Sequence, residues 1–301
     1  MSAIVGHGVY LQFVYFVLQA VISRALDITA KQQCSAYFSN TSEGNIVSRN
    51  YPNYYDPDDF CSYEVEVPSG QRVKIAVSEL ELLEDDGYYY DYLVLFDGPN
   101  CASPRVEVLT NGKDEPIITT SNHFSALHVA SKTLRRKGFN ITYTSIAEDS
   151  VGTYPEFIVN CGHELTSPEG VIEWEASDGD NLLCIWRIHG GPNHLVALKI
   201  TNLKTYNGAD FVRILDGDTC GSREIRKFGP LQWGPQKVIT STSNAMTIVV
   251  RSLDKTSGNK LMASYNLIRS SANRFSGFGY LSLLVFSFES IYRLCNFMYN
   301  L

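Results

Sequence analysis

Apolar and polar residues alternate along most of the chain in short runs, and Gly, Pro and Asn interrupt these runs at close intervals. Typical runs are VKIAV at 73–77, FNITYTSI at 139–146, LVALKI at 195–200 and LMASYNLI at 261–268. Short strands of this kind, without a 3.6-residue period, indicate a β-sandwich rather than a helical protein. The pattern therefore predicts an all-β fold.

The chain repeats itself. Residues 91–101 read DYLVLFDGPNC, residues 210–220 read DFVRILDGDTC, and the two blocks lie 119 residues apart. Each block is a strand followed by an Asp-Gly turn, so the same supersecondary unit occurs twice. Further downstream, residues 116–129 match residues 237–250 in the same way. We expect two tandem domains at 34–147 and 161–269, joined by a linker at 148–160.

The first copy resembles the CUB domain family. The segment 43–65, EGNIVSRNYPNYYDPDDFCSYEV, carries the Asn-Tyr-Pro motif and the second cysteine of that family, and Tyr90-Asp91 and Gly138-Phe139 continue the pattern. The second copy is more divergent, since it lacks the Asn-Tyr-Pro motif and the Gly-Phe step. The resemblance implies two jelly-roll-like β-sandwiches that serve outside cells in protein recognition and sometimes in glycan recognition.

Both ends of the chain differ from the repeats. Residues 9–22 are apolar apart from Gln12 and Gln19, and Ser23-Arg24-Ala25 fits a signal-peptidase site, so we expect a signal peptide at 1–25. The hydrophobic tail at 270–301 has small residues, a polar spacer and an apolar run, which resembles a GPI-attachment signal. A membrane segment, a plainly secreted end and a mispredicted last exon stay open as alternatives. The protein is thus expected to be secreted or held at the cell surface.

Export makes disulfide pairing the default state of the cysteines. The positions of Cys34 and Cys61 match those of Cys161 and Cys184 in the second copy, and both pairs match the first disulfide of the CUB family. The family's second disulfide has no counterpart here, because Tyr88 and Asn207 stand where its first cysteine is expected. Three cysteines therefore have no assigned partner: Cys101, Cys220 and Cys295. Cys101 and Cys220 could pair with each other, pair between chains or stay as thiols.

Many CUB domains bind calcium through three carboxylates, and the resemblance points to Glu84 and Asp91 as ligands in the first copy. Glu84 is one residue out of register, however, and Lys132 stands where the third carboxylate is expected. A cation at a ligand position opposes metal binding. A solvated acidic loop is the preferred interpretation, so no cofactor is expected, with calcium in the first copy as the alternative.

Other features narrow the function. Asn40 and Asn140 lie in glycosylation sequons. The net charge of −7 argues against a nucleic-acid partner, because phosphate binding needs a basic stripe and the one basic cluster, at 132–137, is short. The sequence contains no HExxH, GxSxG or phosphate-loop motif, so an enzyme is not expected.

The sequence therefore predicts an extracellular binding or adhesion protein that recognises a protein or glycan, with attachment to a membrane through the tail as an open question. Two alternatives are a surface or matrix component cross-linked through Cys101 or Cys220, and an accessory module protein of a secreted protease system. CUB modules often flank protease domains, although none is present in this sequence.

Overall fold

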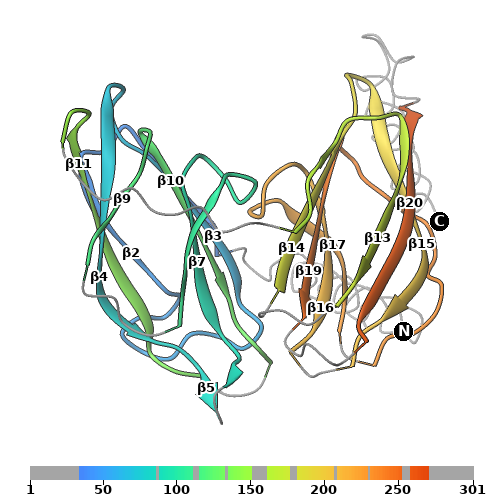
Figure 1. Ribbon diagram of the computed structural model, residues 1–301, viewed down its shortest axis with the longest axis horizontal. Helices are drawn as coiled ribbons and strands as arrows, with labels where there is room; N and C mark the ends of the chain where they lie inside the picture. Colours follow the sequence, from blue (N-terminus) through green and yellow to red (C-terminus); the bar gives the residue numbers. More distant parts are fainter. Residues whose placement is uncertain are drawn as a thin grey trace, which may run out of the picture.

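The computed structural model describes residues 34–85, 88–110, 115–132, 135–150, 161–176, 182–206, 209–229, 231–252 and 258–270. Every regular element in these ranges is a strand, which confirms the all-β prediction, and the strands form two β-sandwiches side by side (Figure 1). We call the sandwich of β1 to β11 module 1 and that of β12 to β20 module 2. The expected signal peptide, the hydrophobic tail, Cys295 and most of the linker lie outside the described residues. Among the described residues, no helix is long and apolar enough to cross a membrane.

Module 1 packs a five-stranded sheet, in the order β1-β3-β10-β7-β8, against a four-stranded sheet, in the order β2-β11-β4-β9. The strands of the first sheet are β1 (Ala36–Ser39), β3 (Phe60–Glu66), β10 (His123–Val129), β7 (Tyr92–Phe96) and β8 (Arg105–Leu109). Those of the second are β2 (Glu43–Val47), β11 (Gly138–Ala147), β4 (Gln71–Glu81) and β9 (Ile117–Ile118), and a small hairpin adds β5 (Glu84–Asp85) and β6 (Tyr88–Tyr89).

Module 2 repeats this topology strand by strand, with sheets β12-β14-β19-β16-β17 and β13-β20-β15-β18. The first sheet contains β12 (Glu164–Leu165), β14 (Leu182–His189), β19 (Ala245–Ser252), β16 (Phe211–Asp216) and β17 (Arg223–Phe228). The second contains β13 (Glu169–Glu175), β20 (Lys260–Arg269), β15 (His194–Lys204) and β18 (Ile239–Thr240). The internal repeat in the sequence is thus a repeat of the whole sandwich.

Alternation along the strands builds a separate core in each module. In β11, Phe139, Ile141 and Tyr143 point inward and are buried, and the residues between them are partly exposed. The equivalent strand β20 buries Leu261, Ala263 and Tyr265 in the same way. Successive side chains of a strand point to opposite faces, so the period of two seen in the sequence corresponds to the two sides of each sheet.

The Asp-Gly turn has the same hydrogen bonds in both modules. Asp97 accepts from the amide of Thr120, and Asp216 accepts from the amide of Thr242. These pairs show that, after the turn, equivalent residues of the two modules are 122 positions apart in the sequence. The sequence match of 116–129 with 237–250 is therefore one residue out of register. The shift from 119 arises because residues 229–238 of module 2 form a longer loop than residues 110–116 of module 1.

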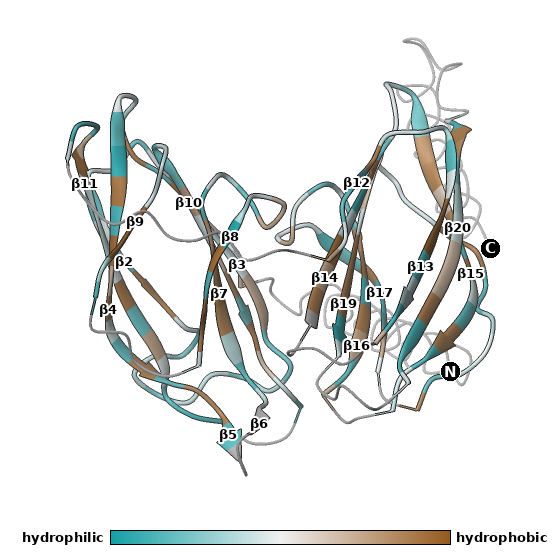
Figure 2. Cartoon of the chain, in the orientation of Figure 1, coloured by the Kyte–Doolittle hydropathy of each residue, from teal (hydrophilic) through white to brown (hydrophobic). Residues whose placement is uncertain are grey.

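The two five-stranded sheets face each other across the boundary between the modules (Figure 1). Apolar residues are concentrated on β14 and β19 at this boundary (Figure 2). A third apolar cluster fills it with side chains from both modules: Tyr92, Val94, Phe96, Leu127 and Val129 from module 1 and Leu183, Phe211, Leu215 and Val249 from module 2. The modules therefore share a core and do not hang freely on a linker.

Candidate functional site

The residues expected to bind calcium in module 1 do not form an open site. Asp91 is fully buried, and its two carboxylate oxygens accept hydrogen bonds from the hydroxyl of Tyr55 at 2.5 Å and from the amide of Ser131 at 2.6 Å. Burial raises the pKa of Asp91, and these two hydrogen bonds oppose the rise. Glu84, by contrast, is exposed on β5.

This donor set does not fit calcium. Ca²⁺ takes six to eight oxygen ligands, several of them carboxylates. Here both oxygens of Asp91 already accept hydrogen bonds, and the residue after Ser131 in the chain is Lys132 rather than a carboxylate. In module 2, the amide of Asn259 donates to Asp210 at 2.7 Å. The equivalent aspartates of the two copies, Asp91 and Asp210, therefore both accept hydrogen bonds from within the protein.

Each module contains one internal disulfide, and the two disulfides lie at matching positions. Cys34 is joined to Cys61 with Cα atoms 4.9 Å apart, and Cys161 to Cys184 with Cα atoms 4.7 Å apart. Asp59 lies close to the sulfur atoms of the first disulfide. Because both of those cysteines are oxidised, this cluster offers no thiolate to a metal.

A third disulfide joins the modules. Cys101 and Cys220 are bonded to each other with Cα atoms 5.9 Å apart, and both are buried within the shared apolar cluster. The sequence left three alternatives open for these cysteines, and the structure contains the first of them, a disulfide between Cys101 and Cys220 across the domain boundary. Since the two cysteines occupy equivalent positions, the two modules meet through equivalent faces.

Charged side chains of module 2 reach into module 1 beside this cluster. Asp58 of module 1 accepts from Arg213 at 3.1 Å and also pairs with Lys227. The guanidinium of Arg213 lies 4.7 Å from the ring centroid of Phe60. Burial and the charge of Arg213 lower the pKa of Lys227 to about 8, while Asp58 acts in the opposite direction.

Arg251 makes the deepest of these contacts. Its side chain is buried, donates to the backbone carbonyl of Tyr90, and lies 4.7 Å from the ring centroid of Tyr92. Its charge also lowers the pKa of Asp91, against the larger effect of burial. Our sequence analysis did not find this contact. The signal was present, because Arg213 and Arg251 are cations within otherwise apolar strands, a place where charges are found only when they have a partner.

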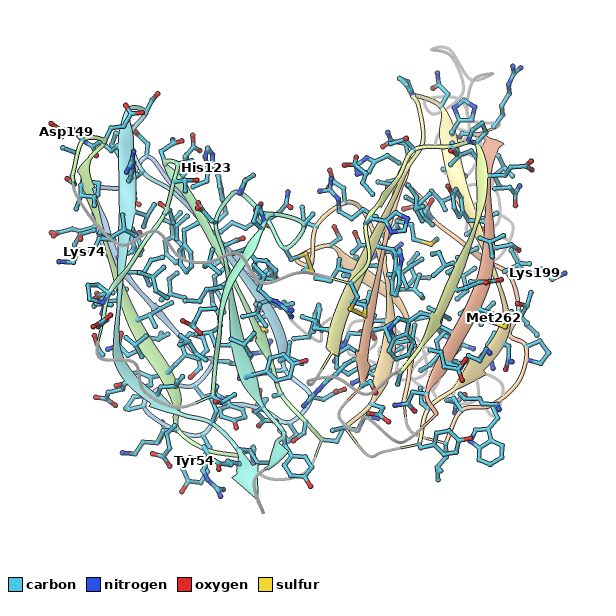
Figure 3. The ribbon with its side chains drawn as sticks, in the orientation of Figure 1. Tyr54, Lys74, His123, Asp149, Lys199 and Met262 are labelled. Atoms are coloured by element: carbon cyan, nitrogen blue, oxygen red, sulfur yellow. A yellow bond between two sulfur atoms is a disulfide. The ribbon has the colours of Figure 1, made fainter. Side chains whose placement is uncertain are left out.

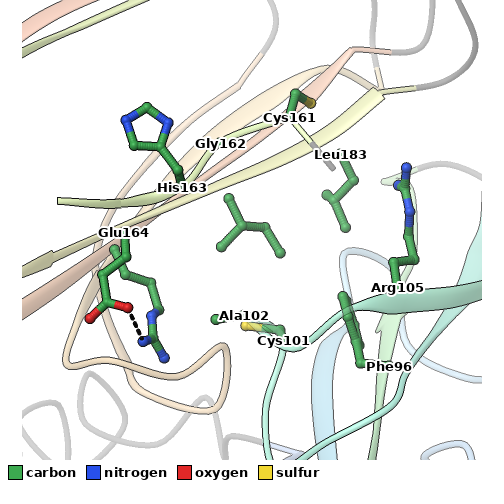
Figure 4. A pocket seen from close by; sticks show the side chains of 11 residues that line it. Phe96, Cys101, Ala102, Arg105, Cys161, Gly162, His163, Glu164 and Leu183 are labelled. Carbon is green, nitrogen blue, oxygen red and sulfur yellow. Dashed lines mark ion pairs between the residues drawn. The ribbon is translucent and has the colours of Figure 1, made fainter. Parts of the chain in front are cut away.

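A small cavity opens beside the interdomain disulfide (Figure 4). It has a volume of about 130 Å³ and is lined by both modules, with Phe96 and Arg105 on one side and Leu183 and Glu164 on the other. An ion pair of 3.4 Å joins Glu164 to Arg187 at its edge. The cavity could hold a single small polar group.

A second feature missed by the sequence analysis is an exposed aromatic surface on module 2. Tyr206, Leu231 and Trp233 are all exposed, and the rings of Tyr206 and Trp233 lie 5.7 Å apart between centroids. The segment GPLQWGPQK at 229–237 was the signal, since the corresponding segment of module 1 is the polar TNGKDEP at 110–116.

The sequon asparagines lie on different parts of module 1. Asn40 is exposed in the turn after β1 and has a φ of 55°. Asn140 lies on β11, where its side-chain oxygen accepts from Asn45 at 3.0 Å. A glycan on Asn40 would extend from a turn, whereas one on Asn140 would lie over the outer sheet.

The model of the CUB domain family matches residues 34–143 and 161–265, more than two thirds of the chain. The chain belongs to the CUB domain family. Each of the two matched segments falls within one of the sandwiches described above. CUB domains are non-catalytic binding modules, which supports a role in protein recognition or as an accessory protein.

Similar proteins include neuropilin and tolloid-like protein 2 from Homo sapiens, 26% identical over 204 residues that cover 62% of this chain and 39% of that protein. Procollagen C-endopeptidase enhancer 1 from Homo sapiens is 26% identical over 195 residues, 62% of this chain and 42% of that protein. The chain thus spans about two fifths of the length of these relatives. Among solved structures, the CUB1-EGF-CUB2 domain of human MASP-1/3 matches 76% of this chain and 100% of that chain at 17% identity, with a TM-score of 0.32.

Proposed function

We propose that this chain is an extracellular binding protein whose two CUB domains act as one rigid recognition unit. The observation that carries the proposal is the junction, where a buried disulfide, a shared apolar cluster and buried charged contacts fix the two domains together. A fixed pair of domains presents its loops at constant distances, so less ordering entropy opposes the binding of a large partner. Three disulfides also suit an oxidising compartment.

The proposal includes the processing expected from the sequence. A signal peptide removed after about Ala25 would direct the chain to the secretory pathway, where Asn40 and Asn140 would be glycosylated. A GPI-attachment signal in the tail would anchor the protein to the cell surface, and we include this anchored form in the proposal. Release of the protein from cells by a phosphatidylinositol-specific phospholipase would support this form, and a protein found only in the medium would contradict it.

The intramolecular disulfide weighs against a cross-linked structural component, because it occupies Cys101 and Cys220. An accessory role in a protease system is the second candidate, since one relative carries the name procollagen C-endopeptidase enhancer 1. That role also depends on protein recognition, so a single experiment addresses both.

The test is an array of purified extracellular protein domains probed with the oxidised, secreted protein. We expect saturable binding to at least one domain, and at least tenfold weaker binding by the double variant Cys101→Ser/Cys220→Ser, in which the domains are no longer covalently joined. The matched control is an unrelated secreted β-sandwich protein of similar size. If no domain of the array binds this protein more strongly than it binds the control protein, protein recognition is contradicted.

A further inference from the structure

Large apolar side chains lie in solvent at one end of module 2. Leu231 is 69% exposed, Trp233 61% and Tyr206 38%, and we call these three residues the aromatic platform. The planes of its two rings are inclined at 53°. Exposed apolar groups that gather in one place are typical of binding surfaces, because single exposed residues are common but clusters are not.

The backbone holds the platform in place. The amide of Leu231 donates to the carbonyl of Thr205 at 2.8 Å, and that of Gly234 donates to Leu203 at 3.0 Å. The buried hydroxyl of Thr205 donates to the carbonyl of Gly229 at 2.6 Å. These bonds attach the loop to the end of β15, so the exposed rings belong to an ordered structure. The loop is three residues longer than its counterpart in module 1, ten against seven, and it carries Leu231 and Trp233.

Lysines lie beside the platform on the same face. Lys204 is paired with Trp233 on one side and with Lys260 on the other, and residues directly opposite each other in adjacent strands point to the same face of a sheet. Lys260 contacts Glu175 at 3.0 Å across the sheet, and Lys237 is exposed on the platform's own loop. Lys199 and Met262 lie further along this outer sheet (Figure 3). Beside the platform, Lys204, Lys237 and Lys260 therefore outnumber the two nearest glutamates on this face, Glu173 and Glu175.

We propose that the platform and its lysines bind an acidic oligosaccharide. The apolar faces of a pyranose ring pack against aromatic rings, and its acidic groups are attracted to ammonium groups. Neighbouring strands lie about 4.8 Å apart, close to the length of one pyranose residue. A sugar over Trp233 would thus place the acidic groups of the following residues near Lys204 and Lys260. This inference deepens the proposed function, on which it rests, by giving module 2 its own class of ligand.

The experiment titrates the intact, oxidised protein with a heparin octasaccharide by calorimetry. We expect measurable binding that weakens with salt, because salt screens the attraction between charges. Trp233→Ala should weaken binding at least tenfold, and Trp233→Tyr, which keeps an aromatic ring, should stay within threefold of the native protein. The double variant Lys204→Gln/Lys260→Gln should weaken binding at least tenfold and reduce its salt dependence. Tyr37→Ala is the matched control, since Tyr37 is equally exposed but lies on module 1, and it should leave binding unchanged.

Two further probes separate the contributions of sugar and charge. A glutamate octapeptide supplies the acid without the sugar, and a dextran octasaccharide supplies the sugar without the acid; both should bind at least tenfold more weakly than heparin. Equal binding of the glutamate peptide, or native affinity of Trp233→Ala, would overturn the proposal. So would Trp233-dependent binding to phosphatidylserine vesicles without binding to heparin, which would make the ligand a lipid surface. Failure with heparin would leave the result of the protein array unchanged, so the two proposals fail separately.

Discussion

Cys101 and Cys220 occupy the same place after the same Asp-Gly turn in the two modules, and a disulfide joins them to each other with Cα atoms 5.9 Å apart. A bond between equivalent positions requires the two modules to meet face to face through the same side of each sandwich. The apolar cluster around the bond has side chains from both modules. Equivalent faces that pack in this way resemble the two-fold interface of a homodimer, here built within one chain.

His128 makes the stability of module 1 dependent on pH. Its imidazole is completely buried between the rings of Tyr55 and Phe139, and neither ring nitrogen has a hydrogen-bond partner. Burial lowers the pKa of His128 from 6.5 to about 3. The unfolded chain therefore binds a proton that the folded chain does not, and stability present above pH 6.5 is lost as the pH falls toward 3.

We expect the free energy of unfolding of module 1 to fall by about 2 kcal/mol between pH 7 and pH 5 from this residue alone. Urea denaturation at the two pH values measures the change. The equivalent residue of module 2 is Val250, so His128→Val is the matched variant, and it should lose this part of the pH dependence. An unaltered pH dependence in the variant would show that other groups cause it.

Asp58 is the module 1 carboxylate that pairs with the cations of module 2 at the edge of the junction. Because Arg213 and Lys227 both pair with it, Asp58→Asn would leave two largely buried cations side by side, with Glu224 as the remaining partner of Arg213. We expect a loss of about 2 kcal/mol in the free energy of unfolding, less than the cost of breaking a fully buried pair because Asp58 is partly exposed. Glu175→Gln is the control, since it removes the acid of an exposed ion pair with Lys260 and should cost less than about 1 kcal/mol. Similar losses in both variants, measured by denaturation, would contradict this role of the junction.

Calcium should not stabilise the protein. The melting temperature is expected to be the same in 2 mM Ca²⁺ and in excess chelator, because both oxygens of Asp91 accept hydrogen bonds from Tyr55 and Ser131 and, among the described residues, Asp91 belongs to no group of three metal-ligating side chains. A site with a dissociation constant of about 0.1 mM would instead add about 1.8 kcal/mol at that concentration. Differential scanning fluorimetry distinguishes the two cases, and a reproducible rise in calcium would revive Glu84 and Asp91 as ligands.

The repeat, the sandwich fold and the Asp-Gly turns could be predicted because they are local patterns of strand and turn residues. The partner of Cys101 could not be predicted, since it depends on how two folded domains pack against each other. No local sequence pattern indicates that packing. The one-residue error between 116–129 and 237–250 has another cause, because β10 and β19 are buried on both faces and so lack the alternation that would fix their register. The aromatic platform was not predicted, because the periodicity of the sequence does not distinguish an exposed Trp in a loop from a buried Trp in a core.

The most direct test of the fixed two-domain unit is cleavage of the linker. A recognition sequence for a site-specific protease is inserted after Gly152, and the secreted protein is cut and run on a denaturing gel without reductant. Cys34–Cys61 and Cys161–Cys184 each lie within one fragment, so among the disulfides of the described residues only Cys101–Cys220 can hold the fragments together. We predict one band at the mass of the uncut protein, which separates into two fragments only after reduction. Two fragments without reduction, or a band at twice that mass, would contradict the account.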